Sequence, residues 1–149
     1  MIIKRNDLIK KIHTVWPDLL DAMPKATNIA IPDNAYWLLK RKDVEWILSD
    51  TWINKYGYIA EGFDCDDSAM LFHAFCIQER YKRMQEAGKT GWLPFAIGQA
   101  WGTRFQGKET GHAINIAISS DEGIIFMEPQ NDKTWVADSN RDHVHFLRL

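Results

Sequence analysis

The spacing of the apolar residues changes once along this chain, and that change constrains the fold most. Up to Gly88 the apolar residues recur at the three- and four-residue spacing of helices, and after it they form short alternating runs typical of strands. The longest helical pattern predicts a helix over about residues 64–86. Its buried stripe consists of Cys65, Ala69, Phe72 and Cys76. Helices followed by strands predict an α+β fold with an antiparallel sheet.

Shorter patterns predict the other elements. Helices are expected over residues 8–16, ending before Pro17, then over 36–39, and over 44–47 with an extension towards Trp52. The strands are expected over residues 95–105, 113–118, 124–127, 134–136 and 144–147. Since no linker interrupts the sequence, we expect one domain over residues 1–149, with a helical part over 1–50 and the long helix and sheet over 62–149.

Composition excludes several classes of protein. The formal net charge of the 149 residues is −2, and no basic run is longer than Lys40-Arg41-Lys42, so nucleic acid is not expected as a partner. No run of apolar residues approaches the length of a membrane span, and residues 1–7 do not resemble a signal peptide. We therefore expect a cytoplasmic or mature soluble protein.

Cys65 stands at the predicted start of the long helix. The positive end of the helix dipole and the free backbone N–H groups there stabilise a thiolate, which is the nucleophilic form of cysteine. Gly62, just before it, allows the backbone to approach a substrate closely. The alternative is an inert buried cysteine, which is the common case for a free cysteine and is the interpretation given to Cys76 in the middle of the helix.

A predicted hairpin places a histidine beside a carboxylate. Pairing the apolar faces of the two strands, with Ile116 opposite Ile124 and Ile114 opposite Phe126, puts His112 directly opposite Glu128. Such a carboxylate can orient an imidazole that takes a proton from a thiol. The alternative is an ordinary ion pair at the edge of the sheet.

Three segments carry a resemblance to a known superfamily. Residues 62–69, 111–113 and 126–129 resemble the papain/transglutaminase-like cysteine peptidases. The two similar branches are the bacterial transglutaminase-like cysteine proteinases and the calcium-dependent protease domain at the C-terminus of a mushroom agglutinin. The resemblance implies a papain-like fold and a cysteine hydrolase, a thiol protease or amidase acting through a thioester intermediate on a protein or peptide substrate. It implies a catalytic triad of Cys65, His112 and Glu128.

The resemblance also implies that calcium can activate the protein, although no cofactor is required. Asp64, Asp66 and Asp67 place three carboxylates within four residues, and carboxylate oxygens are ligands that Ca²⁺ prefers. Neutralising them would favour the thiolate of Cys65. The alternative is helix capping, which we favour for Asp67, whereas Asp64 and Asp66 are the candidate calcium ligands.

One departure from the family pattern supports a different function. Papain-like enzymes often use a glutamine shortly before the cysteine as an oxyanion donor, and no glutamine precedes Gln78. Asn54, Tyr58 and Trp52 are the candidate replacements. The alternative function is a non-catalytic binding or regulatory module that retains the fold, with Trp92, Trp101 and Trp135 expected to be exposed. A subunit of a structural assembly is a third class.

Overall fold

A computed structural model of the chain describes residues 1–19, 29–88 and 93–149. The α-helices are α1 (Arg5–Val15), α2 (Arg41–Asp50) and α3 (Cys65–Glu86), and the short 3-10 helices are η1 (Pro17–Leu19) and η2 (Ile53–Lys55). The strands are β1 (Ile2–Lys4), β2 (Ile29–Ala30), β3 (Ala35–Trp37), β4 (Ile97–Phe105), β5 (Lys108–Ile118), β6 (Ile124–Glu128), β7 (Lys133–Val136) and β8 (His143–Arg148).

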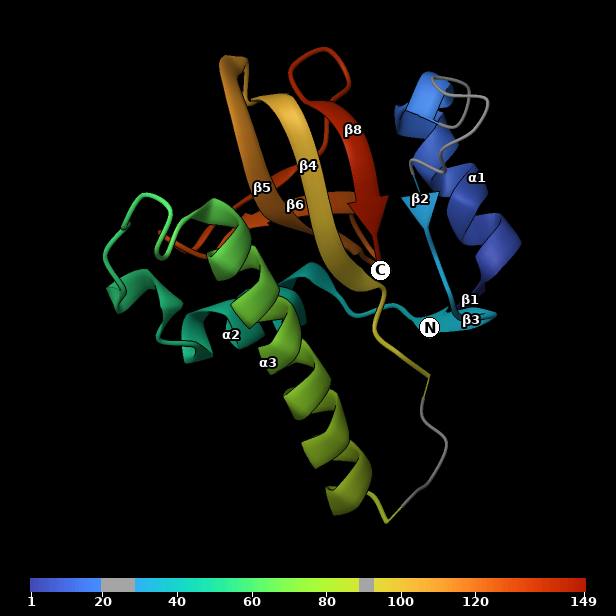
Figure 1. Cartoon of the computed structure of the whole chain (residues 1–149). Helices are drawn as coiled ribbons and strands as arrows, with labels where there is room; N and C mark the ends of the chain where they lie inside the picture. Colours follow the sequence, from blue (N-terminus) through green and yellow to red (C-terminus); the bar gives the residue numbers. More distant parts are fainter. Residues whose placement is uncertain (20–28, 89–92) are drawn as a thin grey trace.

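A six-stranded sheet forms the centre of the molecule, with strand order β2-β8-β4-β5-β6-β7, and β1 pairs with β3 in a separate two-stranded sheet. Helices pack on both faces of the large sheet (Figure 1). On one face α1 buries Leu8 and Ile12 against Ile116 and Phe126. On the other face α2 and α3 pack against a second apolar cluster of the same strands. Alternate residues of β5 and β6 therefore contribute to two different cores.

Helix α3 begins where the sequence pattern predicts and buries the face that the pattern predicts. Ala69, Phe72 and Cys76 are buried at helical spacing and face the sheet. The buried amide of Asn115 on β5 also fixes the helix, because its Nδ2 donates to the carbonyl of Ala69 at 2.8 Å and to that of Gly98 at 2.9 Å. The Asn115 side chain thus joins the first turns of α3 to β4 and β5, and it positions this end of the helix relative to the sheet.

The prediction of a helix over residues 36–39 is wrong. Tyr36 is fully buried, Trp37 is 38% exposed and Leu38 is buried again, an alternation that fits a strand rather than a helix. The backbone of this segment pairs with residues 2–4. The first 50 residues are therefore not the purely helical part that was expected, since their described part also contributes β1, β2 and β3.

The fold class also requires correction. The sheet is mixed, because β2 runs parallel to β8 while the other pairs are antiparallel. Among the described residues strands outnumber α-helices, and helices cover both faces of the sheet. A papain-like α+β arrangement, with helices packed on an antiparallel sheet, is therefore not the right description. Within residues 1–19, 29–88 and 93–149, no helix is both long and apolar enough to cross a membrane.

Candidate functional site

The start of α3 is held by its own acidic residues. Asp64 has an extended backbone and is the N-cap, and its N–H donates to the Asp67 carboxylate at 3.3 Å. The Ser68 hydroxyl donates to the carbonyl of Asp64 at 2.8 Å. The capping role expected for Asp67 is confirmed. Cys65 follows the cap directly and is partly exposed.

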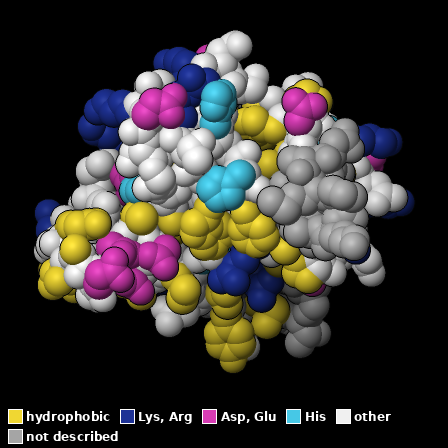
Figure 2. Space-filling model, turned by 45° about the horizontal axis from the view of Figure 1, so that its top comes forward, with side chains coloured by type: hydrophobic (Ala, Val, Ile, Leu, Met, Phe, Trp, Pro, Cys, Tyr) yellow, Lys and Arg dark blue, Asp and Glu magenta, His cyan; other side chains and the backbone are white. Residues whose placement is uncertain are grey.

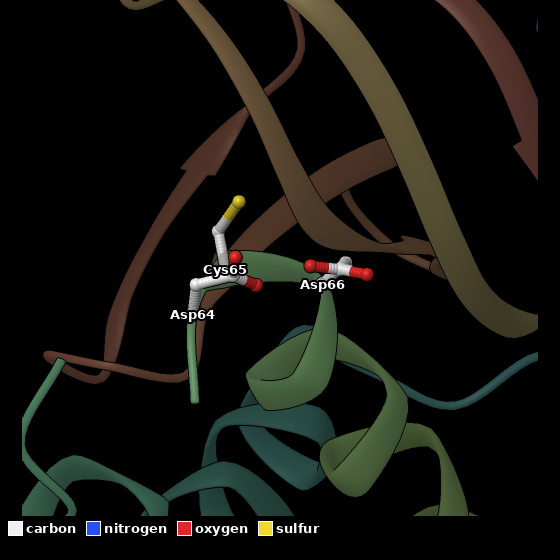
Figure 3. Close-up of side chains that lie close together, drawn as sticks. All are labelled: Asp64, Cys65 and Asp66. Carbon is white, nitrogen blue, oxygen red and sulfur yellow. The ribbon is translucent and has the colours of Figure 1, made fainter. Parts of the chain in front are cut away.

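Asp64, Cys65 and Asp66 bring their ligand atoms within 4.8 Å of one another (Figure 3). The hydrogen bond between the side chains of Asp64 and Asp66, together with burial and the charge of Asp64, raises the pKa of the Asp66 carboxyl above its usual range. One oxygen of Asp64, Oδ1, is buried and lacks a hydrogen-bond partner among the described residues. Two carboxylates placed in this way either share a proton or hold a hard cation such as Ca²⁺, whereas the thiol is too soft to be a calcium ligand.

His112 on β5 contacts the Glu128 carboxylate on β6 through its Nε2 atom. Their side chains are only 21% and 12% exposed. The predicted contact is therefore present, but the predicted register is wrong. Ile116 pairs with Phe126 and Ile118 with Ile124, a shift of two residues from the expected pairing.

The two-residue shift places His112 on a diagonal from Glu128 rather than directly opposite it. An even shift keeps both side chains on the same face of the sheet, and long side chains can reach a diagonal neighbour. The ring of Phe105 packs against the imidazole edge to face, with centroids 6.1 Å apart. The histidine is thus fixed by an aromatic ring and a carboxylate.

A shallow groove of about 270 Å³ joins these features at the start of α3. It is lined by Cys65, Asp66, Trp101, Gly102, Thr103, Gly111, His112, Ala113 and His145. Cys65 and His112 thus face one space, with Glu128 in contact with the histidine. Figure 2 shows this end of the molecule, where histidine and acidic side chains lie among hydrophobic ones. The roles of nucleophile, base and orienting carboxylate stay predictions.

The oxyanion candidates do not line the groove formed by the described residues. The amide of Asn54 donates to Asp132, so this donor is already engaged. Trp52 and Tyr58 are 72% and 64% exposed. The sequence analysis chose oxyanion candidates that precede Cys65 in the chain. The residues that face Cys65 across the groove instead belong to β4, β5 and β8.

Two lining residues, Trp101 and His145, were not predicted as part of the site. They lie on β4 and β8, which pair antiparallel, and the register of the pair shifts between Trp101 and Gly102 so that His145 has no partner in it. Simple alternation along either strand therefore gave no signal for this pair of residues. Trp101 is half-buried, and its ring packs on Phe146 with centroids 5.2 Å apart. Trp135 was expected to be exposed, but it packs on Phe126, and Trp92 lies outside the described residues.

Cys76 differs from Cys65 as expected. It is 2% exposed, and burial raises the pKa of its thiol far above the usual range, with a smaller contribution from the charge of Glu79. A thiol in this environment stays protonated and inert at neutral pH.

Comparison with known proteins gives a family match and two similar folds. The sequence matches the family described as Agglutinin C-terminal over residues 36–134. The structure of a PSL1a-E64 complex superposes with a TM-score of 0.73 at 18% identity, over 99% of this chain and 51% of that one. The structure of Polyporus squamosus lectin, bound to the human-type influenza-binding epitope Neu5Aca2-6Galb1-4GlcNAc, gives a TM-score of 0.65 at 19% identity, over 94% of this chain and 48% of the lectin.

These similarities at 18 and 19% identity establish the fold, and this chain spans about half the length of either structure. No curated protein matches the sequence. The matched names are an agglutinin domain and a lectin. The assignment to the papain/transglutaminase-like peptidase superfamily is corrected accordingly, and with it the prediction of an enzyme, a thiol protease or amidase with a catalytic triad.

Proposed function

We propose that this chain, which belongs to the Agglutinin C-terminal family, is a non-catalytic binding module that holds a glycan in the groove at the start of α3. The family match carries the proposal, because residues 36–134 include the start of α3 and both strands that carry His112 and Glu128. A fold-level neighbour that is a lectin bound to a sialylated trisaccharide supports a glycan as the class of ligand.

The chemistry of the groove suits a sugar. A pyranose presents hydroxyl groups at its edges and an apolar patch of C–H groups on its face, so a site for it combines polar side chains with an aromatic surface. Trp101 offers the aromatic surface. The Asp66 carboxylate can accept hydrogen bonds from sugar hydroxyls, and the Thr103 hydroxyl can both donate and accept them. His112, which Glu128 orients, serves as a further polar contact.

Cys65 forms part of the groove wall in this proposal and performs no reaction. A serine in its place preserves the size of the side chain and its ability to form hydrogen bonds, so glycan binding is expected to survive Cys65→Ser. Cys65 labelling by iodoacetamide is likewise expected to proceed at the same rate in the parent protein and in His112→Ala. A rate that falls several-fold on His112→Ala would show that the histidine activates the thiol, and would overturn the non-catalytic assignment.

Binding is tested by titrating the protein with Neu5Acα2-6Galβ1-4GlcNAc and with its neutral disaccharide part in a calorimeter. We expect Trp101→Ala to weaken binding at least tenfold, since it removes the aromatic surface. Trp46→Ala is the matched control, because Trp46 is 49% exposed on α2 and does not line the groove. No binding of either sugar, or equal loss in both variants, would contradict the proposal.

The acidic pair at the edge of the groove is the proposed calcium site. Asp64 and Asp66 would hold the ion and lose their mutual repulsion, which strengthens the cap of α3. We expect millimolar CaCl₂ to raise the thermal midpoint of the parent protein and to leave that of Asp64→Asn/Asp66→Asn unchanged. MgCl₂ at the same concentration controls for ionic strength, and equal shifts with both salts would remove calcium from the proposal.

A further inference from the structure

Helix α3 carries a second apolar stripe in addition to the one that packs on the sheet. Met70, Ile77 and Tyr81 are 51%, 49% and 59% exposed, Ala74 is also exposed, and Met84 is partly exposed. We call these five residues the outer seam. At about 100° per residue, the outer seam lies about 130° around the helix axis from the buried stripe. Its side chains therefore face solvent.

The spacing of the outer seam is that of a coiled coil. Its residues follow one another at intervals of four, three, four and three along α3. This is the heptad pattern that keeps one side of a helix against a second helix. The buried stripe of the same helix occupies other heptad positions, so the two apolar faces are independent of each other. The sheet needs one face, and the second face is available to a partner helix.

The outer seam is also hollowed in the way that such packing requires. Ile77, Tyr81 and Met84 surround a hollow of about 330 Å³, together with Gln78 and Arg80 of the same helix. In a coiled coil each apolar side chain enters a hole formed by residues of the facing helix. Figure 1 shows that the last turns of α3 extend beyond the large sheet, so a second helix can approach this end.

The charges along α3 favour a second copy of the same helix as the partner. The helix begins at an acidic end, formed by Asp64, Asp66 and Asp67. Its far end, over residues 79–86, carries three basic residues, Arg80, Lys82 and Arg83, and two acidic ones, Glu79 and Glu86. Arg83 is paired with Glu79 at 2.6 Å, whereas Arg80 and Lys82 form no ion pair within the described part of the chain.

This distribution of charge selects the direction of pairing. Two antiparallel copies of α3 place the acidic start of each helix towards the basic end of the other, whereas parallel copies would set like charges side by side. The helix dipoles also favour the antiparallel arrangement, since the positive end of one helix then lies near the negative end of the other.

We propose that the outer seam joins two copies of this chain into a symmetric dimer in which the two α3 helices run antiparallel. Five residues a side are far fewer than the roughly 20–30 of a standard stable interface, so we expect a dissociation constant on the order of 10–100 µM. At about 1 µM the chain is then a monomer, and the outer seam adds nothing to unfolding measured there. The inference rests on α3 alone and does not depend on the proposed function.

Sedimentation equilibrium over protein concentrations from about 1 to about 500 µM tests the dimer. The mean mass of the parent protein should rise from that of one chain towards that of two. Ile77→Glu puts a charge at the centre of the outer seam and should weaken association at least tenfold. Ile59→Glu is the matched control, because Ile59 is 61% exposed and lies in the loop before α3. It should leave the association unchanged.

Two further measurements keep the test independent of one variant. Tyr81→Glu changes a second position of the outer seam and should have the same effect as Ile77→Glu, with circular dichroism as the check that each variant is folded. Raising NaCl from about 50 to about 500 mM should weaken the dimer several-fold, since salt screens the attraction between the oppositely charged helix ends.

Other results would count against the inference. The mass of a single chain at every concentration, or a dimer that persists in both Ile77→Glu and Tyr81→Glu, would overturn it. A dimer that salt strengthens or leaves unchanged would overturn the antiparallel arrangement. The glycan titration should be the same in Ile77→Glu as in the parent protein. A monomer that still binds the trisaccharide would therefore refute the dimer and leave the proposed function intact.

Discussion

His112 and Glu128 contact each other across a diagonal of the sheet, because the strands pair two residues away from the register that their apolar residues predict. The contact therefore depends on side-chain length and on the packing of Phe105 against the imidazole, rather than on direct opposition.

Replacing Glu128 with glutamine tests the strength of this contact. We expect Glu128→Gln to lower the free energy of unfolding by about 1–2 kcal/mol, since a mostly buried histidine loses a charged hydrogen-bond partner. Urea denaturation measures the change. Glu109→Gln is the control, because Glu109 is 75% exposed and lies 3.6 Å from Arg104, so its loss should cost almost nothing. Equal effects of the two substitutions would contradict this account.

Phe126 supports the strand that carries Glu128. It is fully buried, and its ring lies within 5.7 Å of the ring centroids of Trp16, Phe105 and Trp135. Phe126→Ala should therefore cost about 3–5 kcal/mol through lost burial and the cavity that remains. Thermal and urea unfolding measure it, and Tyr81→Ala, at a 59% exposed position, should stay within about 0.5 kcal/mol of the parent.

Gly98 marks the closest approach between β4 and the end of β8. A Cβ atom at this position would lie 1.8 Å from the carbonyl oxygen of Arg148, which is backbone and cannot move aside cheaply. Gly98→Ala should destabilise the protein by about 3 kcal/mol or more. Gly111→Ala, where no atom lies within 4 Å of the new Cβ, should be nearly neutral. A stable Gly98→Ala protein would show that β8 can be displaced.

Glu45 makes part of the stability depend on pH. Hydrogen bonds from Thr134, at 2.6 Å, and from Arg41, at 2.7 Å, lower the pKa of its carboxyl. Because the folded pKa is below the unfolded value of about 4.3, this stabilisation is present above that value and is lost as the pH falls through the folded pKa.

Thr134→Val removes the first of these hydrogen bonds with little change of shape. We expect it to lower the free energy of unfolding by about 1 kcal/mol at pH 7, and we expect the difference from the parent protein to shrink at pH 3. Urea denaturation at the two pH values measures it. The same deficit at both would mean that Thr134 acts through packing and not through the Glu45 carboxylate.

The sequence by itself determined the parts of this protein that depend on local pattern. The start and length of α3 followed from a buried stripe and an acidic cap. The contrast between Cys65 and Cys76 followed from their positions on that helix. The face shared by His112 and Glu128 followed from alternation, which survives any even shift of register.

The tertiary structure decided what depends on contacts between distant segments. The register of β5 and β6 is fixed by packing of whole strands, and two neighbouring apolar registers could not be separated by their residues alone. Tyr36 became a strand residue because residues 2–4 offered it a partner. The groove combines residues at the start of α3 with residues of β4, β5 and β8, and no local pattern encodes which side chains will meet there. Periodicity fixes the faces of single elements, whereas the free energy of packing selects their neighbours.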